Sequence, residues 1–366
     1  MGSNAPITWI EKLEEWLNVD VDTMDPAFPG TLPIKPHNQT SNQLIVSEHM
    51  VLPENREMFL QAVRDHKDQG WQVVLTRVSA QLCAKNIGNL QGRVLLQTSP
   101  SYAYDTDKVV EHARAYAREL EKVGIGKDRL CIKIPCTGPA MNAGPILLQE
   151  GIRTLGTSLF SLPQAIAASQ AGCLYISPYY NEVKAHADLA LWPNVEDPAL
   201  DHTMSARMIQ MLETYKRLYK ETGKEQPLVK AASFISPQEA MAAGEMGCHH
   251  ATISPEVLTK LAQLPYDPSK QPGEGIPKPK GYVYENAAPT PARLAKLSKI
   301  DPLGPADWDG KLASTDVDYL ANNGAELQKA IEADPATKAR LFEALELFKG
   351  GEMRSKAAIE EAMKLV

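Results

Sequence analysis

A (β/α)₈ barrel of the TIM type is the fold class that the sequence predicts, and two observations predict it. Between about residues 90 and 260, short apolar and β-branched runs alternate with segments of helical periodicity, the pattern of βα units in a parallel sheet. The six runs cover residues 93–97, 130–134, 154–160, 174–177, 228–233 and 250–253. Two further strands are expected at residues 19–23 and around residues 37–42. Eight strands favour a barrel over a doubly wound sheet, and no GxGxxG or Walker-type loop follows any of them, which argues against a nucleotide-binding fold.

Helix-start signals follow several of these strands. Asp105 or Thr106 is expected to cap a helix whose apolar stripe extends to Val123, since short polar side chains satisfy the first backbone N–H groups of a helix. A serine followed by a proline stands at residues 236–237 and again at 254–255, the pairing of an N-cap with a proline in the first helical position. Both places are therefore expected to join a strand to a helix.

The 366 residues are expected to form a single domain with a barrel core at about residues 13–263. Residues 264–310 contain nine prolines, too many for regular structure, so this segment is expected to be a lid, a binding loop or disordered. Its Tyr282 and Tyr284 either reach over the barrel mouth or anchor the segment. Residues 311–366 are expected to close the chain with extra C-terminal helices, because helical periodicity returns from Val317.

The composition indicates an ordinary globular protein, with 43% hydrophobic and 23% charged residues. A net charge of −7 gives no reason to expect nucleic acid or an anionic membrane as a partner. Five cysteines without framework spacing predict reduced thiols. The start lacks the apolar region of a signal peptide, and no apolar run approaches the ~20 residues that span a bilayer. We expect a cytoplasmic protein with small-molecule partners, and homo-oligomerisation stays open.

Lys133 is the candidate for chemistry that the pattern singles out. It lies between Ile132 and Ile134 in an apolar strand, and alternate residues of a barrel strand face the interior. With the isoleucines in the sheet–helix layer, Lys133 faces inward near the carboxyl end of its strand, where TIM barrels place catalytic residues. Burial lowers the pKa of an amine and makes it nucleophilic toward carbonyls. The alternative is a lysine that snorkels to solvent or pairs with a carboxylate.

Several motifs in register extend this pattern along the chain. They are GRV at residues 92–94, IKIPCT at 132–137, GIRTLGT at 151–157, YISPY at 175–179, ASF at 232–234 and ATISP at 251–255. Their order and spacing resemble the transaldolase family, from about residue 13 to about residue 264 and more weakly beyond. The resemblance implies a TIM barrel and a class I, cofactor-independent enzyme that forms a Schiff base with a ketone and makes or breaks a C–C bond.

The resemblance assigns catalytic residues of the transaldolase family to matching positions of this chain. Lys133 resembles the Schiff-base lysine of the family, and Asp22 resembles the first-strand aspartate that exchanges protons with the substrate. Thr157 resembles the threonine that helps to hold the catalytic water. Taken singly, Asp22 could instead be a turn residue.

The resemblance assigns substrate-binding residues to this chain in the same way. Asn42 resembles the second-strand asparagine that binds substrate hydroxyls, and Ser177 and Ser233 match serines of the substrate and phosphate sites. The alternatives are an Asx-turn for Asn42 and caps for the two serines. No metal site is expected, since neither the consecutive Cys248, His249 and His250 nor the acidic residues 20, 22 and 25 have a complete ligand pattern.

Two positions near the lysine depart from transaldolases. Where those enzymes carry a glutamate on the third strand, this chain has Gln97, and where they carry a phenylalanine after Ser-Pro, it has Tyr179. Both residues resemble fructose-6-phosphate aldolase, the short relative in this family. Glutamine can only hydrogen-bond a water, whereas a tyrosine hydroxyl can hold or protonate it. The catalytic set that the resemblance implies therefore includes both.

The phosphate-binding positions depart as well. The arginine that follows Ser-Pro-Phe/Tyr in the family is Glu182 here, and the transaldolase arginine after Ser-Phe is Ile235. A bidentate cation clamp is thus replaced by an anion and an apolar side chain. Lys184, His186 or Lys230 are candidate replacements, although Lys230 is out of phase with Ser233 and is expected to face the helices. Lys278 and Lys280 of the proline-rich segment are further candidates.

The sequence therefore predicts a transaldolase-like class I aldolase acting on a non-phosphorylated substrate in a specialised biosynthetic pathway, with Glu182 at the far end of the substrate. A housekeeping transaldolase of the pentose phosphate pathway is the first alternative. A non-catalytic barrel used for binding or regulation is the second.

Overall fold

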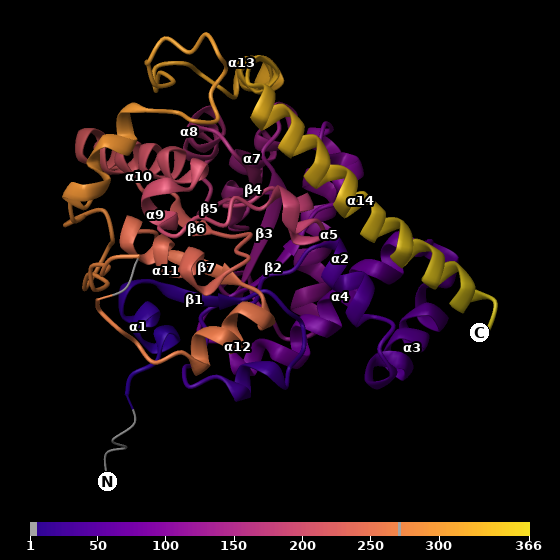
Figure 1. Cartoon of the computed structure of the whole chain (residues 1–366). Coiled ribbons are helices and arrows are strands. Elements are labelled where there is room, and N and C mark those ends of the chain that lie inside the picture. Colours follow the sequence, from indigo (N-terminus) through magenta and orange to yellow (C-terminus); the bar gives the residue numbers. More distant parts are fainter. Residues whose placement is uncertain (1–5, 270–271) are drawn as a thin grey trace.

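The computed structural model describes residues 6–269 and 272–366, and its seven strands pair in parallel throughout (Figure 1). The sheet order is β1-β7-β6-β5-β4-β3-β2. The strands are β1 (Asn18–Val21), β2 (Val94–Gln97), β3 (Leu130–Pro135), β4 (Thr154–Leu159), β5 (Tyr175–Pro178), β6 (Leu228–Ala231) and β7 (His250–Ile253). All seven lie where the sequence predicts strands.

The ring between β1 and β2 is completed by one residue. Gln39 forms isolated parallel bridges to Val21 on one side and to Val94 on the other. The strand expected around residues 37–42 is therefore reduced to this bridge, because Asn42 already caps the next helix. The barrel class is confirmed, but the expectation of eight strands is wrong for the described residues: seven strands and this bridge make up the eight positions.

Helices cover the outside of the sheet (Figure 1). Around the barrel they are α1 (Trp9–Trp16), α2 (Gln43–His49), α3 (Arg56–His66), α4 (Trp71–Asn86), α5 (Thr106–Lys122), α6 (Gly138–Met141), α7 (Ala143–Gln149), α8 (Leu162–Gln170), α9 (Pro198–Asp201), α10 (Thr203–Thr222), α11 (Pro237–Met246) and α12 (Pro255–Gln263). The predicted starts are confirmed, since Asp105, Ser236 and Ser254 each accept a backbone N–H of their helix, at 3.0, 3.3 and 3.5 Å.

Side chains of the strands divide between an outer layer and the barrel lumen. Ile132 and Ile134 belong to the large core between sheet and helices. Leu95, Cys131, Leu155 and Tyr175 form a separate small cluster, which we name the lumen cluster. Because Cys131 alternates with Ile132, the residue two positions after it, Lys133, enters the lumen too. This phase is the one that the sequence predicts.

Residues 278–284 of the proline-rich segment lie at the amino-terminal end of the strands. The Lys278 N–H donates to the Glu15 carbonyl at 2.9 Å, just before β1. The Tyr284 hydroxyl donates to the Pro227 carbonyl at 2.6 Å, just before β6, and Tyr282 hydrogen-bonds Gln226 at 2.8 Å. The two tyrosines therefore anchor the segment, which is the second of the two alternatives stated for them, and they do not reach over the barrel mouth.

The C-terminal helices α13 (Ala321–Ala333) and α14 (Pro335–Met363) follow this segment. Figure 1 shows α14 as a long diagonal rod passing α2 and α4. It packs against α2, the end of β4, and two short 3₁₀ helices that follow β2 and β5, η5 (Pro100–Tyr102) and η7 (Val183–His186). A Cβ at Gly351 would come within 2.8 Å of the α2 backbone, so glycine permits this close approach. Because these partners follow the carboxyl ends of strands, α14 partly covers the opening of the barrel at that end.

Arg207 fastens these peripheral elements to the barrel. Its side chain is 2% exposed and pairs with Asp301 and Asp334, both at 2.8 Å. It also donates to the Phe160 carbonyl beyond β4 and to Thr337, both at 2.9 Å. One side chain thus joins α10, the proline-rich segment, the start of α14 and the barrel.

We expect Arg207→Met to lower the free energy of unfolding by about 3–5 kcal/mol, because it leaves two carboxylates without their cation. Urea unfolding monitored by circular dichroism measures this loss. Lys260→Met on α12 is the matched control, since its exposed pair with Glu256 contributes little. A loss no larger than that of the control contradicts the prediction.

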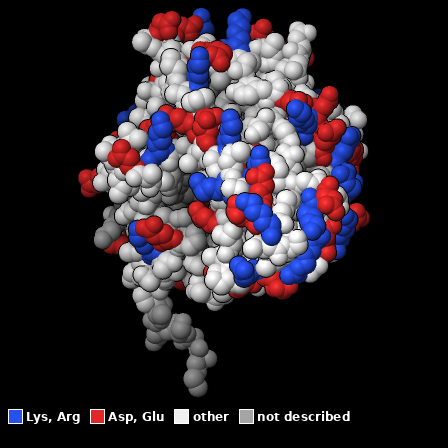
Figure 2. Space-filling model, turned by 90° about the vertical axis from the view of Figure 1, so that its right-hand side faces the viewer, with Lys and Arg blue, Asp and Glu red and all other residues white. Residues whose placement is uncertain are grey.

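Acidic and basic side chains intermingle on the face shown in Figure 2, the pattern of a solvated surface. All five cysteines are free and buried, as the sequence predicts. Among the helices of the described residues, none combines the length and apolarity that crossing a bilayer requires.

Candidate active site

Lys133 stands at the centre of the site, in the second half of β3. Its neighbours across the ladders are Gln97 on β2 and Leu155 on β4. Its side chain is 5% exposed, and Nζ donates to the Ser41 carbonyl at 2.9 Å. Burial lowers the pKa of Lys133, and Asp22 opposes this shift without cancelling it. A buried amine with a lowered pKa has the uncharged fraction that a nucleophile needs.

Asp22 lies directly after β1 and is half-buried at the same end of the barrel. Its N–H donates to the Ile253 carbonyl at 3.0 Å, and the Thr40 hydroxyl donates to Oδ1 at 2.6 Å. Its charge acts on the pKa of both Lys133 and Tyr179. The structure therefore brings a carboxylate to the amine, from segments that are far apart in the sequence.

Thr157 and Tyr179 form a hydrogen-bonded pair beside this carboxylate. Thr157 ends the inward face of β4, Tyr179 follows β5, and their hydroxyl oxygens lie 2.9 Å apart. The Tyr179 ring packs edge-on against Phe160 at 5.5 Å. Burial raises the pKa of Tyr179 to about 12, so the hydroxyl keeps its proton at neutral pH. It is thus available as a hydrogen-bond donor or an acid.

Gln97 is buried with an unsatisfied amide. It is 2% exposed at the end of β2, and neither Oε1 nor Nε2 has a hydrogen-bond partner within residues 6–269 and 272–366. Buried polar groups without partners are rare in folded proteins, so this amide is suited to a water or a substrate group. Ser177, buried on β5, shares the inward phase of Tyr175 and Tyr179.

Asn42 has a structural role as the N-cap of α2. Its Oδ1 accepts the N–H groups of Leu44 and Ile45 at 2.9 and 3.2 Å, which is close to the alternative role of an Asx-turn. Its Nδ2 has no protein partner in the part of the chain that the structure describes. Substrate binding by Asn42 therefore stays a prediction and would use this amide N–H₂.

The comparison with protein families agrees with this geometry. The family model described as transaldolase/fructose-6-phosphate aldolase matches residues 22–294. The chain belongs to this family. Its members are transaldolases and aldolases, so the protein is an enzyme of that type with a class I aldolase-type function. Helices α13 and α14 lie beyond the matched residues.

The loops after β5 and β6 contain the positions at which the resemblance implies a phosphate site. Glu182 is half-buried at the start of η7, and half-buried Ile235 follows β6. Ser233 adopts left-handed backbone with φ 67° and donates to the Asn181 carbonyl at 2.9 Å. His186 Nε2 completes this arrangement at 2.8 Å from the Ser233 hydroxyl. The Ser233 hydroxyl is therefore already held by the loop.

The mouth also contains a cation that the sequence analysis missed. Arg340 of α14 is half-buried, and its Nη1 is buried without a partner among the described residues. Burial lowers the pKa of Arg340, and Glu182 opposes the shift, so the two side chains act on each other. Lys184, the candidate beside Glu182, instead pairs with Glu343 of α14 at 2.6 Å. Only the packing of α14 on η7 brings Arg340 here, and no local pattern could have indicated it.

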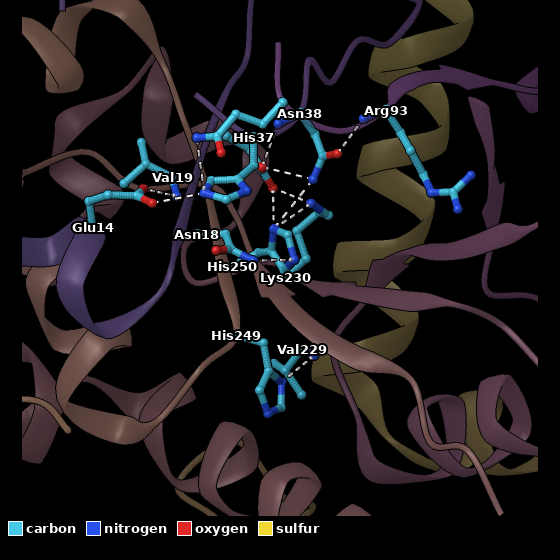
Figure 3. Close-up of polar contacts among 12 residues, drawn as sticks. Glu14, Asn18, Val19, His37, Asn38, Arg93, Val229, Lys230, His249 and His250 are labelled. Atoms are coloured by element: carbon cyan, nitrogen blue, oxygen red, sulfur yellow. Dashed lines mark hydrogen bonds and ion pairs between the residues drawn. The ribbon is translucent and has the colours of Figure 1, made fainter. Parts of the chain in front are cut away.

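Lys230 faces the barrel lumen, whereas the sequence analysis expects it to face the helices. It is fully buried inside the barrel, close to His250 (Figure 3), and its ammonium pairs with Asp20. The expectation used the phase of Ser233, but β6 ends at Ala231 and Ser233 has left-handed backbone, so alternation does not extend that far. Lys278 is excluded as a phosphate ligand too, because it pairs with Glu14 at 2.7 Å at the amino-terminal end of the barrel.

His249 and His250 also serve the fold, and they point to different sides of β7 (Figure 3). His249 accepts the Val229 N–H at 2.9 Å in the outer layer, while His250 approaches Asp20 at 3.0 Å in the lumen. Side chains that diverge in this way do not share one metal centre.

Proposed function

We propose that this enzyme is a transaldolase-like class I aldolase in which Lys133 forms a Schiff base with a ketone donor. The observation that carries the proposal is the buried Lys133 amine, whose pKa is lowered, at the mouth of the barrel beside the Asp22 carboxylate. An uncharged amine adds to a ketone carbonyl, whereas an ammonium cannot. The aldolase family of the chain gives the proposal its reaction class.

The surrounding residues supply the proton transfers that this chemistry needs. Lys133 adds to the carbonyl, and protonation of the resulting hydroxyl followed by loss of one water gives the protonated imine. Tyr179, oriented by Thr157, protonates the departing hydroxyl, and the free amide of Gln97 holds the water. Asp22 accepts the hydroxyl proton as the C–C bond breaks, while the bonding electrons move into the protonated imine to form a neutral enamine. The enamine then adds to an aldehyde, or it is protonated and hydrolysed.

Borohydride trapping tests the proposal on the unmodified enzyme. Incubation with dihydroxyacetone and then borohydride should reduce the imine to a stable amine, and peptide mass spectrometry should locate the adduct on Lys133. Labelling of a different lysine, or no labelling with a panel of hydroxyketones, would overturn the proposal.

We further propose that the substrate lacks a phosphate, which fits a specialised biosynthetic pathway in the cytoplasm. Glu182 and Ile235 occupy the two family arginine positions, and Lys184 is neutralised by Glu343. Asn42 and Ser177 would bind hydroxyl or carbonyl groups of the substrate, and Ser233 would do so by giving up its hydrogen bond to the Asn181 carbonyl. Arg340 favours the rival function, a transaldolase of sugar phosphates, because its buried Nη1 is free. The negative charge of Glu182 offsets the positive charge of Arg340, so the barrel mouth has no net positive charge beside these two residues.

We expect kcat/KM to be higher for fructose and sedoheptulose than for their terminal phosphates. Two missing charge-assisted hydrogen bonds, at about 1.5–3 kcal/mol each, correspond to more than about a hundredfold in phosphate affinity. Glu182→Arg combined with Ile235→Arg should recover part of it, with a gain that weakens as salt rises. Glu182→Gln is the control that removes only repulsion. A clear preference of the unmodified enzyme for the phosphorylated sugars would restore the housekeeping function.

A further inference from the structure

A second lysine, Lys230, lies buried in the lumen within a polar cluster of four side chains. This lumen polar cluster consists of Asp20, Asn38, Lys230 and His250, and the last three of them are labelled in Figure 3. Lys230 pairs with Asp20, and its Nζ lies 3.1 Å from His250 Nδ1. Asn38 donates to Asp20 Oδ1 through its backbone N–H and its amide, both at 2.9 Å. The four side chains come from β1, β6, β7 and the bridge region, which are adjacent around the barrel.

The protonation states in this cluster leave one cation and one carboxylate. Burial alone would raise the pKa of Asp20, but Lys230 and His250 lower it to about 2, so Asp20 is ionised. Burial and the adjacent Lys230 lower the pKa of His250 to about 4, so the imidazole is neutral at pH 7. Burial also lowers the pKa of Lys230, and the ionised Asp20 opposes this shift and favours the ammonium. Lys230 is therefore the cation of the lumen.

The ammonium of Lys230 also lies against an aromatic ring of the lumen cluster. Its Nζ lies 4.4 Å from the centroid of the Tyr175 ring, a favourable cation–π distance. Tyr175 belongs to the lumen cluster with Cys131 and Leu155, and these two residues are the strand and ladder neighbours of Lys133. The two lysines are thus separated by apolar side chains, through which charges interact strongly.

We propose that Lys230 is a positioning residue that acts through Lys133: its charge adds to the effect of burial and disfavours a second ammonium, so that the Lys133 amine is ready to attack a ketone. This inference rests on the proposed function, which makes Lys133 the nucleophile. A neighbouring cation disfavours a second ammonium, a known way of activating a lysine. In support, Lys230 contributes to lowering the pKa of Lys133.

The other groups that face Lys133 are consistent with this role. Asp22 favours the ammonium and opposes Lys230. Burial raises the pKa of the Cys131 thiol to about 12, so Cys131 is uncharged at neutral pH. Lys230 is thus the source of positive charge that acts on Lys133, and it is separate from Asp22, which handles the substrate proton.

The test is the pH dependence of imine formation, measured as the rate of borohydride-trapped adduct with dihydroxyacetone. Asp20→Asn combined with Lys230→Met removes the ion pair without leaving a buried charge. We expect the midpoint of the profile to rise by about one pH unit, which makes trapping about tenfold slower at pH 7. At pH values above both midpoints, the rates should converge on that of the wild type, which a general structural defect would not produce.

Two further variants keep the test decisive. Lys230→Gln alone removes the cation and should move the midpoint in the same direction if the double variant does not fold. His249→Gln, on the outer face of the neighbouring strand, should keep the wild-type midpoint. If the wild type traps an imine but its midpoint equals that of the folded Lys230 variant, the inference is wrong and the proposed function stands. If the wild type traps no imine, the proposed function itself fails.

Discussion

Lys133→Met is expected to remove both the borohydride-trapped adduct and all measurable turnover. Methionine is nearly as long as lysine and is apolar, so it suits a position in the barrel lumen that is 5% exposed. The fold loses only the hydrogen bond to the Ser41 carbonyl. No nearby amine can substitute, because Lys230 is fully buried and paired with Asp20.

Steady-state kinetics with mass spectrometry of the trapped peptide measure this effect, and a thermal melt confirms that the variant is folded. Lys184→Met is a suitable control, since Lys184 lies on the exposed loop after β5 and pairs with Glu343. Turnover by a folded Lys133→Met enzyme would contradict the prediction. It would favour the alternative that Lys133 is a structural lysine, which snorkels to solvent or pairs with a carboxylate.

Tyr179→Phe is expected to lower the aldol rate by roughly 10²–10⁴-fold, the contribution typical of one acid–base group. The substitution deletes only the hydroxyl that contacts Thr157 at 2.9 Å and leaves the ring against Phe160. Because burial raises the pKa of Tyr179 to about 12, the hydroxyl is protonated across the range in which the enzyme is assayed. In the wild type, activity that depends on this proton is lost only when the pH rises above that pKa. The Tyr179→Phe variant should therefore reduce kcat at all lower pH values, and the midpoint of the pH–rate profile, which Lys133 sets, should not move.

Tyr180→Phe provides the matched control in the next residue. Tyr180 is equally buried, but its hydroxyl donates to the Pro198 carbonyl at 2.6 Å and serves the fold. Its loss should reduce stability and leave kcat close to that of the wild type. Equal aldol rates in wild type and Tyr179→Phe would exclude Tyr179 as the acid, and would remove the likeness to fructose-6-phosphate aldolase at this position.

The sequence by itself determined the strands, the helix starts and the inward phase of Lys133. These features are local: two-residue alternation decides which side chains of β3 face the lumen, and a serine before a proline begins a helix wherever it packs. The motifs around Lys133, Thr157 and Tyr179 carried the family resemblance, and the family match confirms it. Asp22, Gln97, Thr157 and Tyr179 lie at the expected strand ends because parallel strands bring their carboxyl ends to one side.

Only the tertiary structure decided the features that depend on contacts between distant segments. Gln39 pairs with two strands at once, so a single residue replaces the expected second strand. The direction of Lys230 depends on where β6 ends, and its burial depends on Asp20, which lies across the chain on β1. Arg340 reaches the mouth because α14 packs on η7, whereas Lys278 is held at the opposite end by Glu14. Burial of a charged side chain is costly unless an oppositely charged group pairs with it. The fold brings such partners together from distant parts of the chain, so no local sequence pattern specifies the pair.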